Sequence, residues 1–331
     1  MSEAFNHFVD PGIPTLSVVL NPLELGKHLD IFSSPPWLWG ALQEVQIRVL
    51  TYHKGSRCTL EIALRTVTGW KYLIGKVYVT DRSDVYSAME GIRRAGFGQG
   101  EEFSIPQPIA FLSPLSLLLQ ERVQGRRAED FFLAQNERDW ALAAERCARW
   151  LARFHARGPR VERVFDVNNH LISMERWSWR LAQLGEPFTG KVARLFQGLE
   201  CRASGLGGME MCAGHGSYSP GQVILAGDRT VVFDWDGYDL ADPSRDVARF
   251  IISLHRLGLG RLGSIRALDF AAEVFLKTYM ATGRLDVASR LPFYKAATCL
   301  QLAKYNLAHR VPHWREKIEA MLEEGLRILE G

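Results

Sequence analysis

The stretch that most constrains the fold runs from residue 214 to residue 250, GHGSYSPGQVILAGDRTVVFDWDGYDLADPSRDVARF. Two apolar runs, VILA and TVVF, are separated by Gly227-Asp228-Arg229, a composition typical of β-hairpin turns. Polar side chains that a plain hairpin does not need flank these two runs. They are His215, Ser217 and Gln222 before the first run, and Asp234 and Asp236 after the second. The stretch therefore predicts a hairpin that carries a functional site.

A helix is predicted to follow, because Pro243 stands at its first position in Asp242-Pro243-Ser244-Arg245-Asp246. Asp246 then lies in the first turn, where the helix dipole favours a carboxylate.

This layout resembles the active-site region of the aminoglycoside phosphotransferase and choline kinase-like family. There the pattern is H-G-D-x-x-x-x-N, a hairpin, D-W or D-F, and then D-P-x-x-D. His215-Gly216, Asp234-Trp235 and Asp242-Pro243-x-x-Asp246 match it, and the resemblance covers roughly residues 45–310. Two positions depart: HGSYSPGQ places Ser217 where the catalytic aspartate is expected and Gln222 where the asparagine is expected.

The resemblance implies an α+β class and a bilobal, protein-kinase-like fold. A small N-lobe would hold an antiparallel sheet and one helix, and a larger C-lobe would be mostly helical. The expected boundaries are an N-terminal extension at residues 1–44, the N-lobe at 45–123 and the C-lobe at 124–331.

The implied activity is an ATP- or GTP-dependent phosphotransferase that acts on a hydroxyl of a small molecule or peptide. In such a site Asp234 would bind Mg²⁺, and Gln222 could coordinate it through the amide oxygen, because hard oxygen donors suit this ion. The resemblance also implies that His215 braces the catalytic loop, and that Asp246, at the start of the following helix, likewise braces it.

Ser217 is too weak an acid or base at neutral pH to replace a carboxylate. Three outcomes are open: slow transfer that depends on positioning and charge neutralisation, substitution of the base by Asp236, or a catalytically degenerate pseudokinase that binds nucleotide or ligand only. Acidic residues at position 236 also occur in the family without acting as the base.

Three alternating segments, VQIRVLTYH, RCTLEIALRTV and KYLIGKVYV, predict consecutive antiparallel strands. Lys76 lies in the third, and the resemblance implies that it contacts the nucleotide phosphates with Glu90 of the following helix as its partner. The alternative is an edge-strand lysine and a solvated glutamate, and Glu101 and Glu102 compete for the partner role.

The apolar run LSLLL leads into Gln120, Glu121, Arg122 and Val123, which resemble the hinge between kinase lobes. There the backbone of Gln120, Glu121 and Val123 would pair with the adenine edge. Residues 137–158 predict an amphipathic helix that ends near His155, a place where the helix dipole favours histidine. Trp177 and Trp179 either line an acceptor pocket or belong to the core, and four amphipathic helices follow, at residues 244–257, 265–282, 292–309 and 313–330.

Composition excludes several classes. The 331 residues are 47% hydrophobic and 23% charged with a net charge of +3, so there is no case for a nucleic-acid partner. The five cysteines form no C-x-x-C pair, and neither a signal peptide nor a long apolar run is present, so we expect a cytoplasmic protein without a membrane partner. A positive net charge also argues against a polycationic aminoglycoside as the acceptor.

Overall fold

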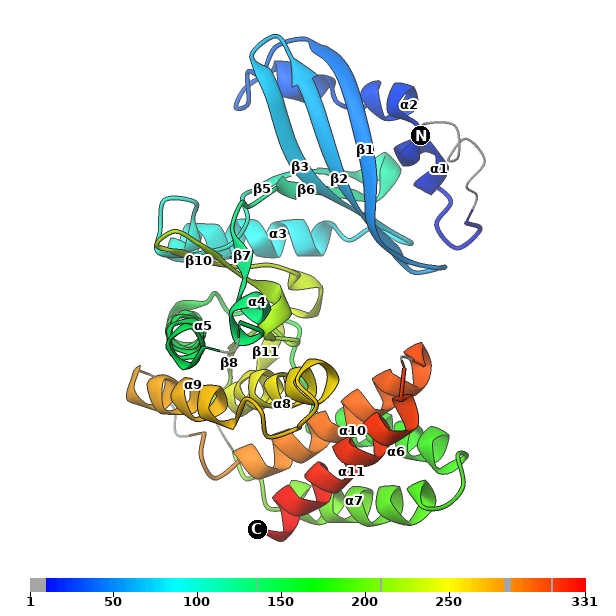
Figure 1. Ribbon diagram of the computed structural model, residues 1–331. Helices are drawn as coiled ribbons and strands as arrows, with labels where there is room; N and C mark the ends of the chain where they lie inside the picture. Colours follow the sequence, from blue (N-terminus) through cyan, green and yellow to red (C-terminus); the bar gives the residue numbers. More distant parts are fainter. Residues whose placement is uncertain (1–9, 135, 209, 283–286, 311) are drawn as a thin grey trace. The chain divides into compact units, whose positions relative to one another are not determined.

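A computed structural model describes residues 10–134, 136–208, 210–282, 287–310 and 312–331. The chain divides into two compact units, residues 1–124 and residues 125–331. A sheet dominates the first unit and helices dominate the second (Figure 1). The predicted α+β class is therefore confirmed.

The first unit contains an antiparallel five-stranded sheet with the order β1-β2-β3-β6-β5. Its strands are β1 (Leu42–His53), β2 (Arg57–Thr66), β3 (Gly69–Tyr78), β5 (Pro108–Leu112) and β6 (Leu117–Glu121). The first three are the strands that the alternating pattern predicts. Because β3 pairs with β2 on one side and β6 on the other, Lys76 is not an edge-strand residue.

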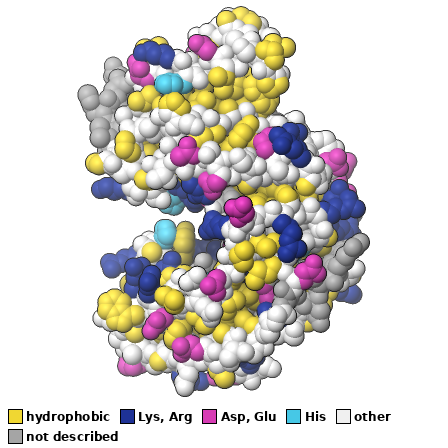
Figure 2. Space-filling view, turned by 180° about the vertical axis from the view of Figure 1, so that it is seen from behind, with side chains coloured by type: hydrophobic (Ala, Val, Ile, Leu, Met, Phe, Trp, Pro, Cys, Tyr) yellow, Lys and Arg dark blue, Asp and Glu magenta, His cyan; other side chains and the backbone are white. Residues whose placement is uncertain are grey.

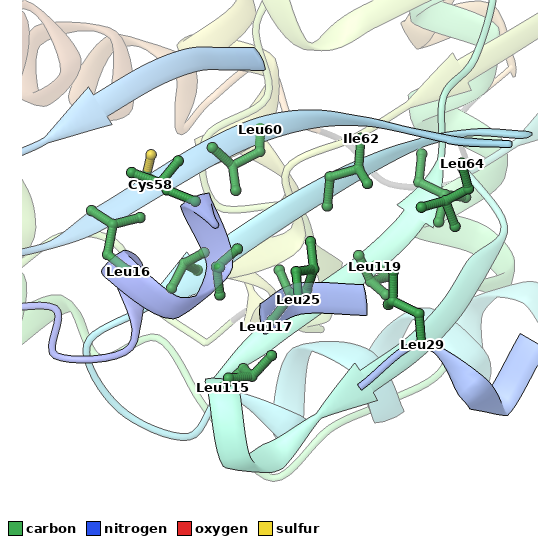
Figure 3. Close-up of a cluster of buried hydrophobic side chains, with 14 of the residues drawn as sticks. Leu16, Leu25, Leu29, Cys58, Leu60, Ile62, Leu64, Leu115, Leu117 and Leu119 are labelled. Carbon is green, nitrogen blue, oxygen red and sulfur yellow. The ribbon is translucent and has the colours of Figure 1, made fainter. Parts of the chain in front are cut away.

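The N-terminal segment covers one face of this sheet. It forms the short helices α1 (Leu16–Leu20), α2 (Pro22–Gly26) and η1 (Asp30–Ser33). The Asn21 side chain caps α2 by accepting hydrogen bonds from the amides of Leu23 and Glu24. Leu16, Leu25 and Leu29 of this segment pack against apolar side chains of β2 and β6, as Figure 3 shows.

The rest of the first unit connects the strands. The helix α3 (Ser83–Ile92) follows β3 and continues into a π-helical turn, η2 (Arg93–Phe97), which Gly96 ends with a positive φ of 96°. The strand β4 (Phe103–Ser104) and the 3₁₀ turn η3 (Ser113–Leu115) complete this part.

The second unit begins with β7 (Arg126–Arg127), α4 (Ala128–Phe132) and the long helix α5 (Glu137–Arg157). Residues 167–203 form α6 (Val167–Ala182) and α7 (Phe188–Ala203). Residues 212–241 then form β8 (Cys212–Gly214), η4 (Pro220–Gln222), β9 (Val223–Ala226), β10 (Arg229–Val232), η5 (Trp235–Gly237) and β11 (Asp239–Ala241).

Four helices close the chain, as predicted. They are α8 (Pro243–Arg261), α9 (Asp269–Thr282), α10 (Leu291–His309) and α11 (Trp314–Glu330). The largely buried helix α10 packs against α6, α7, α8 and α11, and α9 packs against α5. The core of this unit thus lies around α5, α8 and α10. Within residues 212–241, β8 packs against α5 and α8, and β10 packs against α5.

Lys and Arg side chains form several groups on the face in Figure 2, with Asp and Glu side chains interspersed among them. Among the described residues, no helix is long and apolar enough to cross a lipid bilayer.

Candidate active site

The predicted hairpin is present. The strands β9 and β10 pair antiparallel, with Val232 opposite Val223 and Arg229 opposite Ala226. The guanidinium of Arg146 on α5 fixes the turn by donating to the carbonyl oxygens of Gly227 (2.8 Å) and Arg229 (2.5 Å). The hairpin is therefore docked on the helical core.

Asp234 follows β10 in a left-handed conformation, with φ 77° and ψ 62°. Non-glycine residues rarely adopt this conformation, and they do so mostly at sites where the surroundings impose it. The neighbouring Trp235 supplies that constraint, because its buried ring packs against Trp150, Phe154 and His215 and its indole N–H donates to the Val232 carbonyl (3.1 Å). Asp234 thus has a strained backbone, and the buried Trp235 beside it holds that backbone in place.

Asp246 braces the loop at residues 215–222, hereafter the 215–222 loop, as the sequence predicted. Its carboxylate accepts hydrogen bonds from the backbone amides of His215 (2.6 Å) and Gly216 (3.0 Å). Burial alone would raise the pKa of Asp246, but its contact with His155 and the charge of Arg245 hold that pKa well below its ordinary value. Asp246 therefore stays ionised and holds both amides.

The helix-dipole explanation of His155 was incomplete. This side chain is 7% exposed, its Nε2 lies 3.5 Å from Asp246 Oδ2, and its Nδ1 lies 2.8 Å from the Tyr279 hydroxyl. His155 therefore contacts the Asp246 carboxylate and helps to hold it in place. Its position in the last turn of α5 gave no signal of this contact, because the contact joins residues far apart in sequence.

Gly216 is fixed by a close approach between two segments. It has a φ of 83°, and a Cβ atom there would lie 2.3 Å from the Gly237 carbonyl oxygen. Arg245 supports the same region, because its guanidinium binds both carboxylate oxygens of Asp239, with an Nη1–Oδ2 distance of 2.8 Å. The glycine of the His-Gly motif is thus required by geometry.

Ser217, Gln222 and Asp234 form one hydrogen-bonded group. The Gln222 Nε2 atom donates to Ser217 Oγ (2.9 Å) and to Asp234 Oδ2 (3.0 Å), and Ser219 Oγ donates to Gln222 Oε1 (3.0 Å). The structure therefore brings together the two departures from the family pattern and the expected metal ligand.

The imidazole of His215 is buried, and both of its ring nitrogens take part in hydrogen bonds. Its Nε2 lies 3.0 Å from the Phe233 carbonyl oxygen, which can only accept, so Nε2 carries the proton. Its Nδ1 then accepts a long hydrogen bond of 3.4 Å from the Ser217 hydroxyl. The expected bracing role of His215 agrees with these contacts.

The oxygen donors of this group fit magnesium. Among the described residues, no cluster of three or more His, Cys, Asp or Glu side chains could hold a metal ion. Magnesium usually needs only one or two protein oxygens besides water and phosphate oxygens, and Asp234 supplies one. In the present orientation the amide nitrogen of Gln222 faces Asp234, so coordination through Oε1 requires a turn of that amide.

Asp236 lies in η5, two residues after Asp234, and is partly buried. Its backbone carbonyl accepts a long hydrogen bond of 3.5 Å from Arg163 Nη1. The segment of Arg163 is tied to the same region, because Leu240 N donates to the Arg163 carbonyl (2.7 Å).

The remaining predicted residues lie in the first unit. Lys76 is 6% exposed, and it faces the side of the sheet opposite to Leu73 and Val77, which belong to the apolar cluster of the first unit. Glu90 of α3 forms ion pairs with Arg93 (3.0 Å) and Arg94 (3.3 Å).

Of the predicted hinge residues, Gln120 and Glu121 form the end of β6 and Val123 lies beyond it. Gln120 is buried opposite Ile74 of β3. Glu121 exchanges backbone and side-chain hydrogen bonds with Gln107, and Val123 follows one residue before the end of the first unit.

Sequence reasoning missed Asp10. Its carboxylate accepts hydrogen bonds from the Gly55 amide (2.7 Å), the Tyr52 hydroxyl (2.7 Å) and the Gly12 amide (2.9 Å). These bonds hold the pKa of Asp10 below its ordinary value, and the bond to Asp10 raises the pKa of Tyr52 to about 12. Asp10 therefore clamps the turn between β1 and β2; its sequence, Asp-Pro-Gly, signalled only a turn.

A cavity of about 260 Å³ lies beside Gly216 and Gly237 in the second unit. We name it the aromatic cavity, because Phe165, His170 and Trp177 line it together with Arg245. Burial and the charge of Arg245 lower the pKa of His170 to about 4. Trp177 thus lines this cavity, whereas Trp179 is 66% exposed and belongs neither to the core nor to this cavity.

The sequence pattern of the phosphotransferase enzyme family matches residues 87–276, which is more than half of the chain. No curated protein matches the chain significantly.

Several solved structures share the fold. Choline kinase LicA from Streptococcus pneumoniae is 13% identical, with a TM-score of 0.60 and coverage of 93% of this chain and 99% of that chain. Glucosamine kinase in complex with glucosamine, ADP and inorganic phosphate is 17% identical, with a TM-score of 0.62 and coverage of 85% and 81%. A thermostable mutant of aminoglycoside phosphotransferase APH(4)-Ia, in a ternary complex with AMP-PNP and hygromycin B, is 16% identical, with a TM-score of 0.62 and coverage of 89% and 98%. At these identities the likeness shows the fold, which is the kinase-like fold that the motifs implied.

Proposed function

The chain belongs to the phosphotransferase enzyme family, as its motifs predicted, and we propose that it transfers the terminal phosphoryl group of ATP or GTP to a hydroxyl of a small molecule or peptide. One observation carries this proposal. Asp234 is held in a strained left-handed conformation beside Gln222 and Ser217, on a segment that Asp246 and Trp235 fix. Phosphoryl transfer depends mainly on such positioning and on neutralisation of charge.

The nucleotide would bind through the first unit. Support comes from related folds that were solved with ADP or AMP-PNP. Lys76 is proposed to contact the phosphates, because it is a buried cation on the interior strand β3 and faces away from the apolar cluster of the sheet. Glu90 is proposed to orient this site, and the backbone of Gln120, Glu121 and Val123 to bind the base.

Magnesium would be held by Asp234, with the amide oxygen of Gln222 as a second ligand. When bound, the ion would neutralise phosphate charge and orient the terminal phosphoryl group. The strained backbone of Asp234 fixes where its carboxylate stands. Gln222 would join it after a turn of its amide, which replaces the present bonds from Nε2 to Ser217 and Asp234.

Ser217 would position the acceptor. Its hydroxyl donates to His215 and accepts from Gln222, which leaves one lone pair able to accept a hydrogen bond from the acceptor hydroxyl. Serine does not remove that proton at neutral pH, so the loss of a general base, worth about 10²–10⁴-fold, is expected to slow transfer rather than abolish it. Asp236, two residues after Asp234, is the carboxylate that we propose as the candidate base in place of an aspartate at 217.

The second candidate function is a pseudokinase that binds nucleotide without transfer. Ser217 itself favours it, because no carboxylate stands at that position of the loop. Both candidates require nucleotide, and only the first yields a phosphorylated acceptor.

A thermal-shift titration with ATP and GTP, with and without Mg²⁺, tests the shared premise. A ligand that binds only the native state must raise the melting temperature. We expect a magnesium-dependent rise in the wild type that Asp234→Ala removes and that Asp228→Ala, in the exposed turn of the same hairpin, retains. No rise in the wild type overturns both candidates, and a rise that is equal in Asp234→Ala overturns the proposed role of Asp234 in binding the magnesium nucleotide.

A further inference from the structure

A second, larger cavity of about 550 Å³ also borders the 215–222 loop, and Arg249 lines both cavities. Residues 219–222 of the loop form one wall of this cavity. The other walls come from α4, α8, α10 and α11. Gln222 therefore contacts this cavity as well as Ser217 and Asp234.

The lining is strongly basic. Arg249, Arg256 and Arg261 of α8 and Lys317 of α11 line the cavity, which we name the basic cavity after these four residues. The opposing carboxylate is Glu129, which is paired with Arg127 at 3.3 Å. In the described part of the chain, none of the four cations forms an ion pair with a carboxylate.

Two buried donors of this cavity lack a partner. Asn306 of α10 is 2% exposed, and its Nδ2 donates no hydrogen bond among the described residues. The same holds for the Nε atom of Arg249, whose Nη1 donates to Gln301 (3.0 Å). Buried N–H groups are rarely left unsatisfied in proteins, so a ligand that accepts hydrogen bonds would satisfy these two.

The positive charge at Arg249 is poorly balanced. Burial and the neighbouring charge of Arg256 lower the pKa of Arg249 to about 10. Asp246 offsets this in part, but its carboxylate already holds the backbone amides of His215 and Gly216. An anion in the cavity would restore the balance.

We propose that the basic cavity binds an oxyanion group of the acceptor, which makes the substrate class hydroxyl compounds that carry a carboxylate, sulfate or phosphate. This inference rests on the proposed function, because it assigns the ligand of the basic cavity to the same reaction. Arginine and asparagine donors match oxyanions in geometry and charge. The same lining repels an ammonium group, so a cation such as choline or protonated glucosamine is disfavoured as the acceptor of this chain.

Titration of inorganic phosphate and sulfate tests binding without turnover. The full chain, free of nucleotide and magnesium, is titrated calorimetrically at constant ionic strength. We expect the Kd for both anions to rise at least about tenfold in the double variant Arg256→Gln/Lys317→Gln. This rise corresponds to a loss of about 1.4 kcal/mol or more of binding free energy. The control Arg138→Gln/Arg315→Gln removes the same charge from outside the cavity and should bind as the wild type does.

A third variant, Lys76→Gln, distinguishes the basic cavity from the proposed nucleotide-phosphate site and should not weaken anion binding. The inference is overturned if neither anion binds, if the cavity variant binds as its control does, or if only Lys76→Gln loses binding.

Turnover with matched acceptors separates this inference from the proposed function. Each pair consists of a neutral sugar and its uronic acid or phosphate ester. We expect kcat/KM to favour the anionic member at least about tenfold, and the cavity variant to lose that preference through KM. Equal rates for neutral and anionic acceptors overturn the inference and leave the proposed function intact. Anion binding in the cavity with no nucleotide consumption overturns the proposed function, and with it the assignment of the anion to an acceptor, while the anion site itself stands.

Discussion

At the scale of single residues, Gly216 fixes the path of the 215–222 loop. Its φ is 83°, and a Cβ atom at this position would lie only 2.3 Å from the Gly237 carbonyl oxygen, which leaves no room for another residue. Gly216→Ala should therefore lower the free energy of unfolding by about 2 to 4 kcal/mol, from left-handed strain plus a displaced backbone. Urea unfolding followed by circular dichroism measures this change.

Gly227→Ala is the matched control for that measurement. Gly227 has a positive φ of 56° in the hairpin turn, but open space surrounds its Cα. It should lose only the strain contribution, about 1 to 2 kcal/mol. Equal losses in the two variants would show that the approach of Gly237 does not constrain the loop.

We expect Ser217 to limit the rate of the proposed phosphoryl transfer. Ser217→Asp restores a carboxylate that can act as a general base, so kcat should rise by about 10²–10⁴-fold. Ser217→Ala removes the proposed neutral hydrogen bond to the acceptor and no acid or base group, so kcat should fall only about fivefold. Steady-state rates of ADP release measure both changes, and an aspartate variant no faster than the wild type would place the base elsewhere, with Asp236 the first candidate.

His170 links stability to pH. Its native pKa is about 4, below the unfolded value near 6.5, so between these values the unfolded chain binds more protons than the native chain. The wild type should therefore lose stability as pH falls from about 6.5 to about 4. His170→Asn should show a flatter dependence of Tm on pH in this window, whereas the exposed control His313→Asn should follow the wild type; identical slopes for all three would contradict the assignment.

At the scale of elements, the N-terminal segment is part of the first unit. Asp10 ties it to the turn between β1 and β2 through the Gly55 amide and the Tyr52 hydroxyl. Asp10→Ala should speed amide exchange in residues 54–57, because the amide of Gly55 loses its acceptor. Hydrogen exchange with mass spectrometry measures this change, with Asp30→Ala as the control, and unchanged exchange in both variants would contradict the clamp.

The sequence predicts most helices and long strands of this chain, because their periodicity reflects burial of one face. The alternation of β1 to β3 and the stripes of α5, α8 and α11 are examples. The short strands β7, β8 and β11 escaped prediction, since two or three residues carry no period and their pairing depends on tertiary contacts. The support of Asp246 by His155 escaped for the same reason.

The sequence predicts only part of the candidate site. The Asp246 brace followed from its place in the first turn of α8, which local sequence determines. The hydrogen bonds from Gln222 to Ser217 and Asp234 did not, because they depend on how the 215–222 loop folds back on the end of β10.

At the scale of the whole molecule, the distribution of charge matters more than its sum. A net charge of +3 says little about a ligand, yet the fold gathers arginines of α8 with Lys317 of α11 around one cavity. Their spacing in sequence, more than fifty residues, conceals this cluster. The proposed preference for an anionic acceptor is therefore a property of the fold and not of the composition.

The most direct test of the central claim is phosphoryl transfer itself. ATP or GTP with Mg²⁺ is incubated with neutral sugars, uronic acids and sugar phosphates, and the transferred phosphate is followed by ³¹P NMR. The account predicts a new phosphate ester in the wild type and in Asp228→Ala, and a rate lower by about 10²–10³-fold in Asp234→Ala. Equal transfer by Asp234→Ala would contradict the assigned site. No ester from a wild type that nucleotide stabilises would contradict transfer and identify the chain as a nucleotide-binding pseudokinase.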